Sequence, residues 1–257
     1  SSEGVATPFD RTPDQPEPFG YNVSWFAVKA SDPASVLGAL EFGEGTPANW
    51  SSGLAAVYGK PSSGNRWVFV SPPVSGWIFA ISLGWPYPTT ETHHDIGTRF
   101  EILFSRLMKR FDDVQFFGSH QVSDFAAWAR ALNGKPTRLF AWSGSAGEVF
   151  MNFGDRSLEE AKLGLVNLTG LSPRSATDEI FRIAGEESDE QRRLVANGLS
   201  HAEAPAKVYK NGHSAFPDEE NVVALAALWS IDPTQLVDDG HPPGLGLAVQ
   251  LPNHLSQ

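Results

Sequence analysis

Cysteine is absent from the 257-residue chain, and this removes several kinds of chemistry at once. Disulfides, thiolate nucleophiles, iron–sulfur clusters and cysteine-based zinc sites all require it. A chain of this length can bury a sizeable core. With 17 phenylalanines and 8 tryptophans, that core must be held by packing alone. We expect neither a metal nor a cofactor.

Basic residues are also scarce. Lys and Arg together number 19 against 30 Asp and Glu, which gives a net charge of −11 at pH 7. Such a surface repels phosphate groups, which argues against nucleic acid and anionic membranes as partners. The excess is concentrated between Asp178 and Asp239, where 13 acidic residues stand beside 5 basic ones. This segment is either a set of solvated helix faces or a docking surface for a basic protein.

Long apolar runs are missing too. No stretch approaches the roughly 20 apolar residues that cross a bilayer. Residues 1–20 are polar and contain four prolines, which predicts a flexible tail. We expect a cytoplasmic protein with one folded α+β domain over 21–257, although a removed signal peptide is compatible with a sequence that begins at Ser1.

The apolar pattern predicts a first unit of strand, helix, strand and strand over about 21–83. Residues 23–29 are rich in β-branched and aromatic side chains, as strands are. Asp32-Pro33 is a typical helix start. Three further apolar runs separated by Gly, Ser and Pro predict strands, at 50–58, 66–70 and 76–83. The run at 50–58 is an extra strand of this unit.

The pattern then restarts, which predicts a second unit over about 114–153. Val114-Gln-Phe-Phe117 matches Val23-Ser-Trp-Phe26, and Ser123-Asp124 matches the earlier helix start at Ser31-Asp32. We therefore expect a second helix after Asp124 and an internal repeat. Chance similarity between two amphipathic segments is the alternative.

A helix over 98–111 is expected to join the two units. Its apolar residues recur at helical spacing from Phe100 to Phe111, and Thr98 with Glu101 forms a capping box.

The C-terminal third, 157–239, is predicted to be helical. Ser157 with Glu160 and Ser188 with Gln191 read as capping pairs, and a further helix follows Thr177. Other helix starts stand at Pro217-Asp218 and Asp232-Pro233. After Gly240 the chain is rich in Gly and Pro, and we expect it to be irregular.

Three segments resemble a family of bacterial proteins that has no assigned activity. They are Gly118-Ser-His-Gln-Val-Ser-Asp-Phe-Ala-Ala-Trp-Ala-Arg130, Gly147-Glu148 and Trp229-Ser-Ile-Asp-Pro233. The resemblance covers most of 21–236 and implies a shared fold, but it supplies no catalytic residues.

The order of elements in the two units is similar to that of the vicinal oxygen chelate superfamily. The resemblance to this superfamily implies metal ligands on the first and last strands of each unit. The first-strand positions here hold Trp25 and Phe117, which cannot bind a metal, and only Glu148 on a late strand could. The likeness therefore extends to topology alone.

Three polar groups are candidates for chemistry. His93-His94-Asp95 offers two imidazoles and a carboxylate, but a metal site needs a further ligand that nothing identifies, and a polar loop that caps the next helix explains these residues better. Ser145 lies in a sequence near the nucleophile elbow G-x-S-x-G, yet a strand follows where that motif needs a helix. Ser119, His120 and Asp124 are close in sequence, but Ser and Asp at a helix start serve as caps.

Trp85 and Tyr87 stand in a loop stiffened by Pro86 and Pro88. Large amphipathic rings of this kind anchor interfaces, or they fold back to cover the edge of the sheet. Together with the acidic segment, they favour a non-catalytic protein-binding module. We take Trp85, Tyr87, His93, His94 and Asp95 as its candidate binding residues.

An immunity-type inhibitor of a basic toxin or nuclease is one form of this hypothesis. Two alternatives stay open. One is an enzyme that uses either a metal at His93, Asp95 and Glu148 or the Ser145 hydroxyl. The other is a small-molecule-binding regulator that uses a cleft between the two units.

Overall fold

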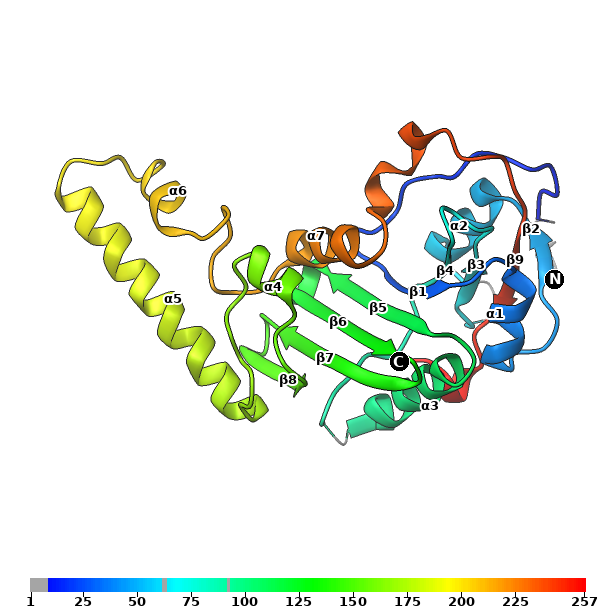
Figure 1. Ribbon diagram of the computed structural model, residues 1–257, viewed down its shortest axis with the longest axis horizontal. Coiled ribbons are helices and arrows are strands. Elements are labelled where there is room, and N and C mark those ends of the chain that lie inside the picture. Colours follow the sequence, from blue (N-terminus) through cyan, green and yellow to red (C-terminus); the bar gives the residue numbers. More distant parts are fainter. Residues whose placement is uncertain (1–8, 62–63, 92) are drawn as a thin grey trace, which may run out of the picture.

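The computed structural model describes residues 9–61, 64–91 and 93–257, which form an α+β fold with a helical C-terminal part (Figure 1). This confirms the predicted fold class. The strands are β1 (Ser24–Lys29), β2 (Thr46–Ala48), β3 (Trp67–Val70), β4 (Trp77–Ser82), β5 (Asp113–His120), β6 (Phe125–Leu132), β7 (Lys135–Ser143), β8 (Glu148–Phe153) and β9 (Gly246–Gln250). The α-helices are α1 (Pro33–Leu40), α2 (Trp50–Tyr58), α3 (Ile96–Met108), α4 (Leu158–Lys162), α5 (Pro173–Ala196), α6 (Ala204–Val208) and α7 (Glu219–Trp229). The 3-10 helices are η1 (His93–Asp95), η2 (Gln121–Ser123), η3 (Pro233–Asp239) and η4 (Asn253–Leu255).

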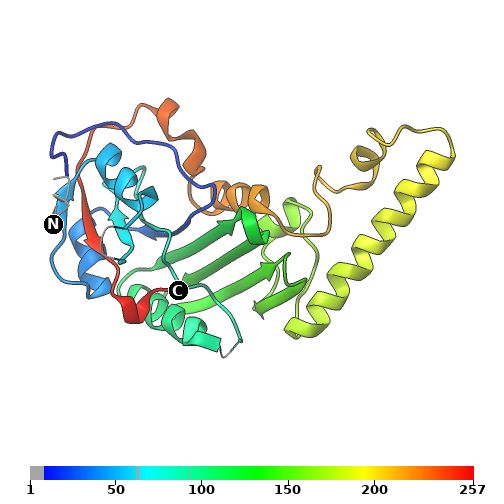
Figure 2. The same ribbon diagram turned by 180° about the vertical axis from the view of Figure 1, so that it is seen from behind.

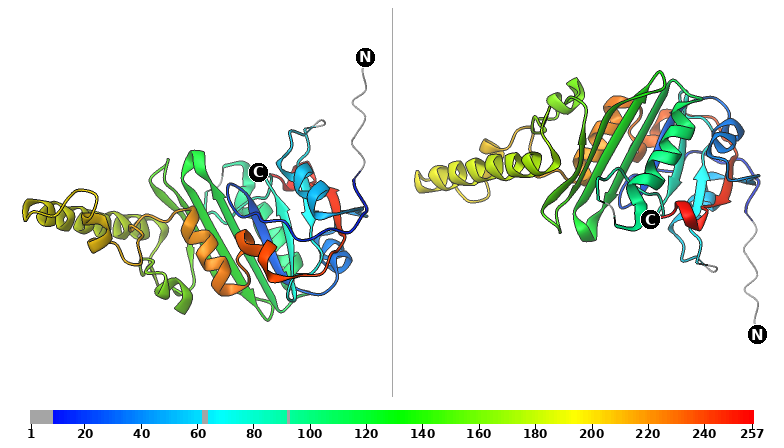
Figure 3. Two further views of the ribbon diagram at one scale, coloured as in Figure 1. Left: turned by 90° about the horizontal axis from the view of Figure 1, so that it is seen from above. Right: turned by 90° about the horizontal axis from the view of Figure 1, so that it is seen from below.

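These nine strands form one sheet in the order β2-β9-β3-β4-β1-β5-β6-β7-β8. Every neighbouring pair is antiparallel. The first strands of the two predicted units, β1 and β5, lie side by side near its centre. Helices α2, α4 and α7 cover one face and α1 and α3 cover the other, so that the two views of Figure 3 show α7 and α3 on opposite sides.

Two apolar layers flank the sheet, because successive side chains of a strand point to opposite faces. In β1, Trp25 and Ala27 belong to the layer beneath α2 and α7, whereas Phe26 and Val28 belong to the layer beneath α1 and α3. The central strands are therefore buried on both faces. This explains why their sequences are continuous apolar runs and not alternating ones.

Residues 125–132 form strand β6, so the predicted second helix is wrong. Its alanines are good helix formers, but Asp124 adopts φ 45° and ends η2 without opening a helix. Trp128 faces one apolar layer while Ala127 and Ala129 face the other, and pairing with β5 and β7 satisfies the backbone. Tertiary packing overrides the local preference. Residues 113–153 are consequently a meander of strands, and the strand-helix order of the first unit is not repeated in them.

Residues 50–58 form helix α2, which corrects the predicted strand. The side chain of Asn49 caps this helix by accepting from the Ser52 backbone N–H at 2.9 Å. The buried residues recur at helical spacing: Trp50, Gly53, Leu54 and Val57. Glycine at position 53 allows close packing, since a Cβ there would lie 2.3 Å from the Phe69 ring.

Of two segments predicted to lack regular structure, one packs against the first half of the sheet and the other contributes a strand to it. The Asp14 carboxylate accepts from the backbone N–H groups of Trp50 and Ser51 at 2.7 and 2.9 Å, and Phe19 is buried in the core. Residues 9–20 are thus packed against the fold instead of forming a flexible tail, while 1–8 lie outside the described residues. Strand β9, in the region expected to be irregular, is inserted between β2 and β3.

The helical assignment of the C-terminal third is confirmed. Ser157 and Glu160 form the predicted capping box of α4, and Asp218 caps α7. The helices predicted from Thr177 and Ser188 are one continuous helix of 24 residues, α5. Helix α3 begins at Ile96, ahead of the expected capping box at Thr98.

Helices α5 and α6 form an arm, residues 173–209, that projects from the sheet (Figures 1 and 2). Within α5, Ala176 and Ile180 are the buried residues, and both lie near its start beside β8. Farther out, Arg182 pairs with Glu179 and Glu186 across single helical turns. Such exposed pairs each contribute only about 0.3–0.5 kcal/mol. The arm is therefore held mainly at its base.

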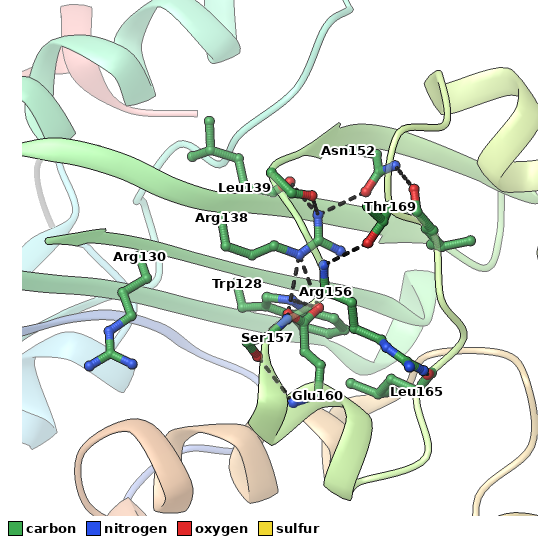
Figure 4. A network of polar contacts seen from close by, with 12 residues as sticks. Trp128, Arg130, Arg138, Leu139, Asn152, Arg156, Ser157, Glu160, Leu165 and Thr169 are labelled. Carbon is green, nitrogen blue, oxygen red and sulfur yellow. Dashed lines mark hydrogen bonds and ion pairs between the residues drawn. The ribbon is translucent and has the colours of Figure 1, made fainter.

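A buried ion pair anchors α4 to the sheet (Figure 4). Arg138 of β7 donates from Nε to Glu160 Oε1 at 3.0 Å, and the two side chains are 4% and 2% exposed. Glu160 also accepts from Trp128 Nε1 at 3.0 Å and from the Ser157 backbone N–H at 2.8 Å. The carboxylate thus holds together two strands and the first turn of α4.

The other end of the Arg138 guanidinium anchors β8 and, through Asn152, the loop that leads into α5 (Figure 4). Its Nη1 donates to Asn152 Oδ1 at 2.8 Å and to the Phe153 carbonyl at 3.0 Å. Asn152 Nδ2 in turn donates to the carbonyls of Leu168 and Leu171. One network therefore connects the sheet, α4 and the loop that leads into α5.

We predict that Glu160→Ala lowers the free energy of unfolding by about 3–5 kcal/mol, because it leaves the Arg138 guanidinium buried without its counter-charge. Urea unfolding measures this. Glu159→Ala, on the same helix turn but outside the network, is the matched control and should change the value by less than about 0.5 kcal/mol. Equal losses in the two variants would contradict the assignment.

Candidate functional site

Trp85 is buried and does not form an exposed anchor. Its side chain is 1% exposed, and its Nε1 donates to the Ala80 carbonyl at 2.9 Å. Its ring packs edge-on against Phe26 at a centroid distance of 5.1 Å. The alternative that this loop folds back onto the sheet is the correct one for Trp85.

Tyr87 is half-buried and forms part of an aromatic cluster. Its ring lies 4.6 Å from that of Phe125 and 6.3 Å from that of Phe150, measured between centroids. Burial, and secondarily the charge of Glu91, raises the pKa of its phenol. Tyr87 therefore contributes both an aromatic ring and a hydroxyl group to this part of the surface.

The His93-His94-Asp95 sequence forms η1, immediately before α3. His94 and Asp95 are exposed, with left-handed φ values of 62° and 54°. The His93 side chain lies outside the described part of the structure. Among the described side chains, no three or more His, Asp and Glu residues are grouped as metal ligands. Glu148, the third residue of the metal-dependent hypothesis, lies exposed at the start of β8.

Ser145 stands in the turn between β7 and β8, as its glycine neighbours suggested. Its backbone N–H donates to the Ser123 carbonyl at 3.0 Å, and its hydroxyl lies 3.2 Å from that of Ser143. The hydrogen bonds of the described residues include none from Ser145 to an imidazole. The strand-turn-strand geometry lacks the helix that supports a nucleophile elbow.

Ser119 and His120 lie together at the end of β5, but they are not part of a catalytic triad. The Ser119 hydroxyl donates to Glu219 Oε2 at 2.5 Å, and His120 Nδ1 lies 3.1 Å from Ser123 Oγ, three residues along the chain. In the described structure, no hydrogen bond joins His120 to the carboxylate of Asp124. A triad needs its base oriented by an acid.

A small hollow lies where the two halves of the sheet meet. Its volume is about 260 Å³, and its polar wall includes Ser24, Ser119, His120, Ser123 and Ser143. The rings of Tyr87, Phe125 and Phe150 form its apolar wall. The residues that line the hollow come from both halves of the chain. The hypothesis of a small-molecule-binding regulator uses a cleft between these halves.

Glu219, at the start of α7, links the hollow to the outer surface. Its Oε2 accepts from the Ser119 hydroxyl and from the Asn22 backbone N–H, the latter at 2.6 Å. Its Oε1 accepts from Gln121 Nε2 at 3.0 Å. A single carboxylate therefore joins α7, the start of β1 and the end of β5.

Two exposed tyrosines lie within electrostatic reach of Glu219. Tyr21 and Tyr58 are 43% and 45% exposed. Partial burial and then the charges of Glu220, Asp232 and Glu219 raise the pKa of Tyr21. Partial burial followed by the charge of Glu219 raises the pKa of Tyr58 to about 12.

We call these five residues, Tyr21, Tyr58, Glu219, Glu220 and Asp232, the tyrosine–carboxylate patch. Figure 3 (left) shows the segments that carry it, which include α7, the N-terminal segment and the approach to η3, on one face of the molecule. The acidic excess of the sequence pointed to part of this patch. The tyrosines were missed because they come from segments far from the acidic one in the chain.

Helices that could cross a bilayer are not found in the described residues. Comparisons of the chain with known protein families, with curated proteins and with solved structures find no match. The residues of the patch and the hollow are therefore the features from which a function can be inferred.

We predict that the last phenol to ionise in the folded protein is Tyr58, near pH 12, against about 10 for an ordinary tyrosine. Because folding raises this pKa, its contribution to stability is complete below about pH 10 and is lost as the pH rises towards 12. Phenolate absorbance measures the titration. Tyr58→Phe should abolish the last step, and unfolding in urea should remove it from the wild type; persistence of the step in Tyr58→Phe would refute the assignment.

Proposed function

We propose that this protein is a non-catalytic binding module that recognises a basic protein through the tyrosine–carboxylate patch. The observation that carries the proposal is the placement of two half-exposed tyrosines near Glu219, with Glu220 and Asp232 also close to Tyr21. Tyr21 and Tyr58 replace Trp85 and Tyr87 as the anchors of the original hypothesis.

Both components of the patch have a physical role in binding. Tyrosine gives large contact area at a low cost in side-chain entropy, and it is enriched among residues that dominate binding energy. Carboxylates around it attract a basic partner and accelerate the encounter. Elsewhere on the acidic segment, α5 carboxylates such as Glu179 and Glu190 are paired with arginines of the same helix. Glu220, by contrast, interacts with a phenol and with no basic side chain of the described residues, so its charge is available to a partner.

An immunity-type inhibitor that covers a basic toxin or nuclease is the concrete form that we favour, in the cytoplasm and without nucleic acid as a partner. The net charge of −11 supports a basic partner. A metal-dependent or serine-based enzyme is the alternative hypothesis.

The test is capture of partners from a lysate by wild-type protein and by two patch variants, Tyr21→Ala and Glu220→Lys. We predict that a basic protein is retained by the wild type, that salt weakens its binding, and that each variant weakens it by about tenfold or more, as expected for an anchor residue or a reversed charge. Neither residue is a helix cap in the structure, so the fold should be preserved.

Glu44→Lys, an exposed charge reversal on the segment before β2, is the matched control and should retain the partner. Equal retention by the wild type and the patch variants would contradict the proposal. So would the capture of acidic proteins alone, or of none.

A further inference from the structure

The hollow between the two halves of the sheet has a hydroxyl-rich wall with fixed geometry. Ser119 and Ser143 are 4% and 5% exposed, so their side chains have little freedom. A hydroxyl both donates and accepts hydrogen bonds. Ser119 and Ser143 already hydrogen-bond protein groups, so the polar contacts of a ligand must come mainly from other hydroxyls of the hollow.

Two hydroxyls of the hollow are without a protein partner. Within the part of the chain that the structure describes, no hydrogen bond engages Ser24 Oγ or the Tyr87 hydroxyl, although both residues are half-buried and line the hollow. Gly118 makes room for Ser24, its partner across β1 and β5, since a Cβ at position 118 would lie 2.6 Å from Ser24 Oγ. Half-buried hydroxyls that lack a hydrogen-bond partner favour the binding of a ligand that forms hydrogen bonds with them.

The lining favours an uncharged ligand, and its one imidazole, that of His120, already lies 3.1 Å from Ser123 Oγ. The described residues of the hollow include no Lys, Arg, Asp or Glu. The nearby Glu219 carboxylate stands behind Ser119, and both of its oxygens already accept hydrogen bonds. An ion that entered would lose water without gaining a counter-charge, which is costly. The matching ligand is uncharged.

The remaining wall and the size of the hollow define the ligand further. The rings of Tyr87, Phe125 and Phe150 give an apolar surface on which the C–H face of a ring can pack. A volume of about 260 Å³ is just below the usual range for ligand pockets, which indicates a molecule of one ring.

We propose that the hollow binds a small, uncharged, polyhydroxylated ring, of the class of a monosaccharide or a cyclic polyol. The Ser24 and Tyr87 hydroxyls hydrogen-bond the ring hydroxyls, and the three aromatic rings contact its apolar face. The lining of this site has no residue in common with the tyrosine–carboxylate patch, and binding there does not depend on a protein partner.

Ligand-observed NMR and calorimetry on the full chain test the proposal with glucose, galactose and myo-inositol as probes. Glucuronic acid and glucosamine serve as anionic and cationic analogues. We expect at least one neutral probe to bind and both charged analogues to bind at least tenfold more weakly. Ser24→Ala and Tyr87→Phe, which remove one hydroxyl each, should weaken binding by about two- to tenfold.

Tyr209→Phe and Ser188→Ala, the same changes on the arm, are the matched controls and should leave binding unaltered. Gly118→Ala, which pushes a methyl group against Ser24, should abolish it, and a thermal unfolding curve shows whether that variant is folded. Failure of all three neutral probes to bind, equal binding of the charged analogues, or equal affinity of Ser24→Ala and the wild type would overturn the proposal. None of these results affects the capture of a basic protein, which uses different residues.

Discussion

The arrangement of the C-terminal third depends on the buried ion pair between Arg138 and Glu160. Two charges in an apolar interior are tolerated only when both are fully hydrogen-bonded, and here each has several partners. The directional bonds of this pair join α4 to β6 and β7, and they continue through Asn152 of β8 to the loop that leads into α5.

The sequence allowed the prediction of features that depend on neighbouring residues. The capping boxes of α4 and the start of α7 were readable because the capping side chain and its amide are three residues apart. Strand β6 was not readable, since its alanine-rich sequence prefers a helix and only pairing with β5 and β7 decides otherwise. The same holds for Arg138 and Glu160, which are 22 residues apart and meet only after the sheet has formed.

In the candidate sites, too, the features that the sequence did not predict depend on residues far apart in the chain. A tryptophan beside a proline looks alike in sequence whether it is exposed or buried, and the burial of Trp85 depends on Phe26 of β1, which is far from it in the chain. Tyr21 and Tyr58 acquire significance only from the carboxylates of α7 and Asp232, which are far from them in the chain. Glu219 belongs to the patch and lies next to the hollow: its charge raises the pKa of Tyr21 and Tyr58, and its carboxylate accepts a hydrogen bond from Ser119, which lines the hollow.

The position of β9 in the sheet has a consequence for biosynthesis. This strand lies between β2 and β3, although about 180 residues of chain separate it from β3 in order of translation. On the ribosome, β3 is therefore an open sheet edge while everything from β4 to η3 is being made. Open edges are prone to pairing with other chains, and contacts between such distant segments form slowly. The first half of the sheet can therefore be completed only after residues 246–250 have been synthesised, whereas all strands of the β5–β8 meander are available long before.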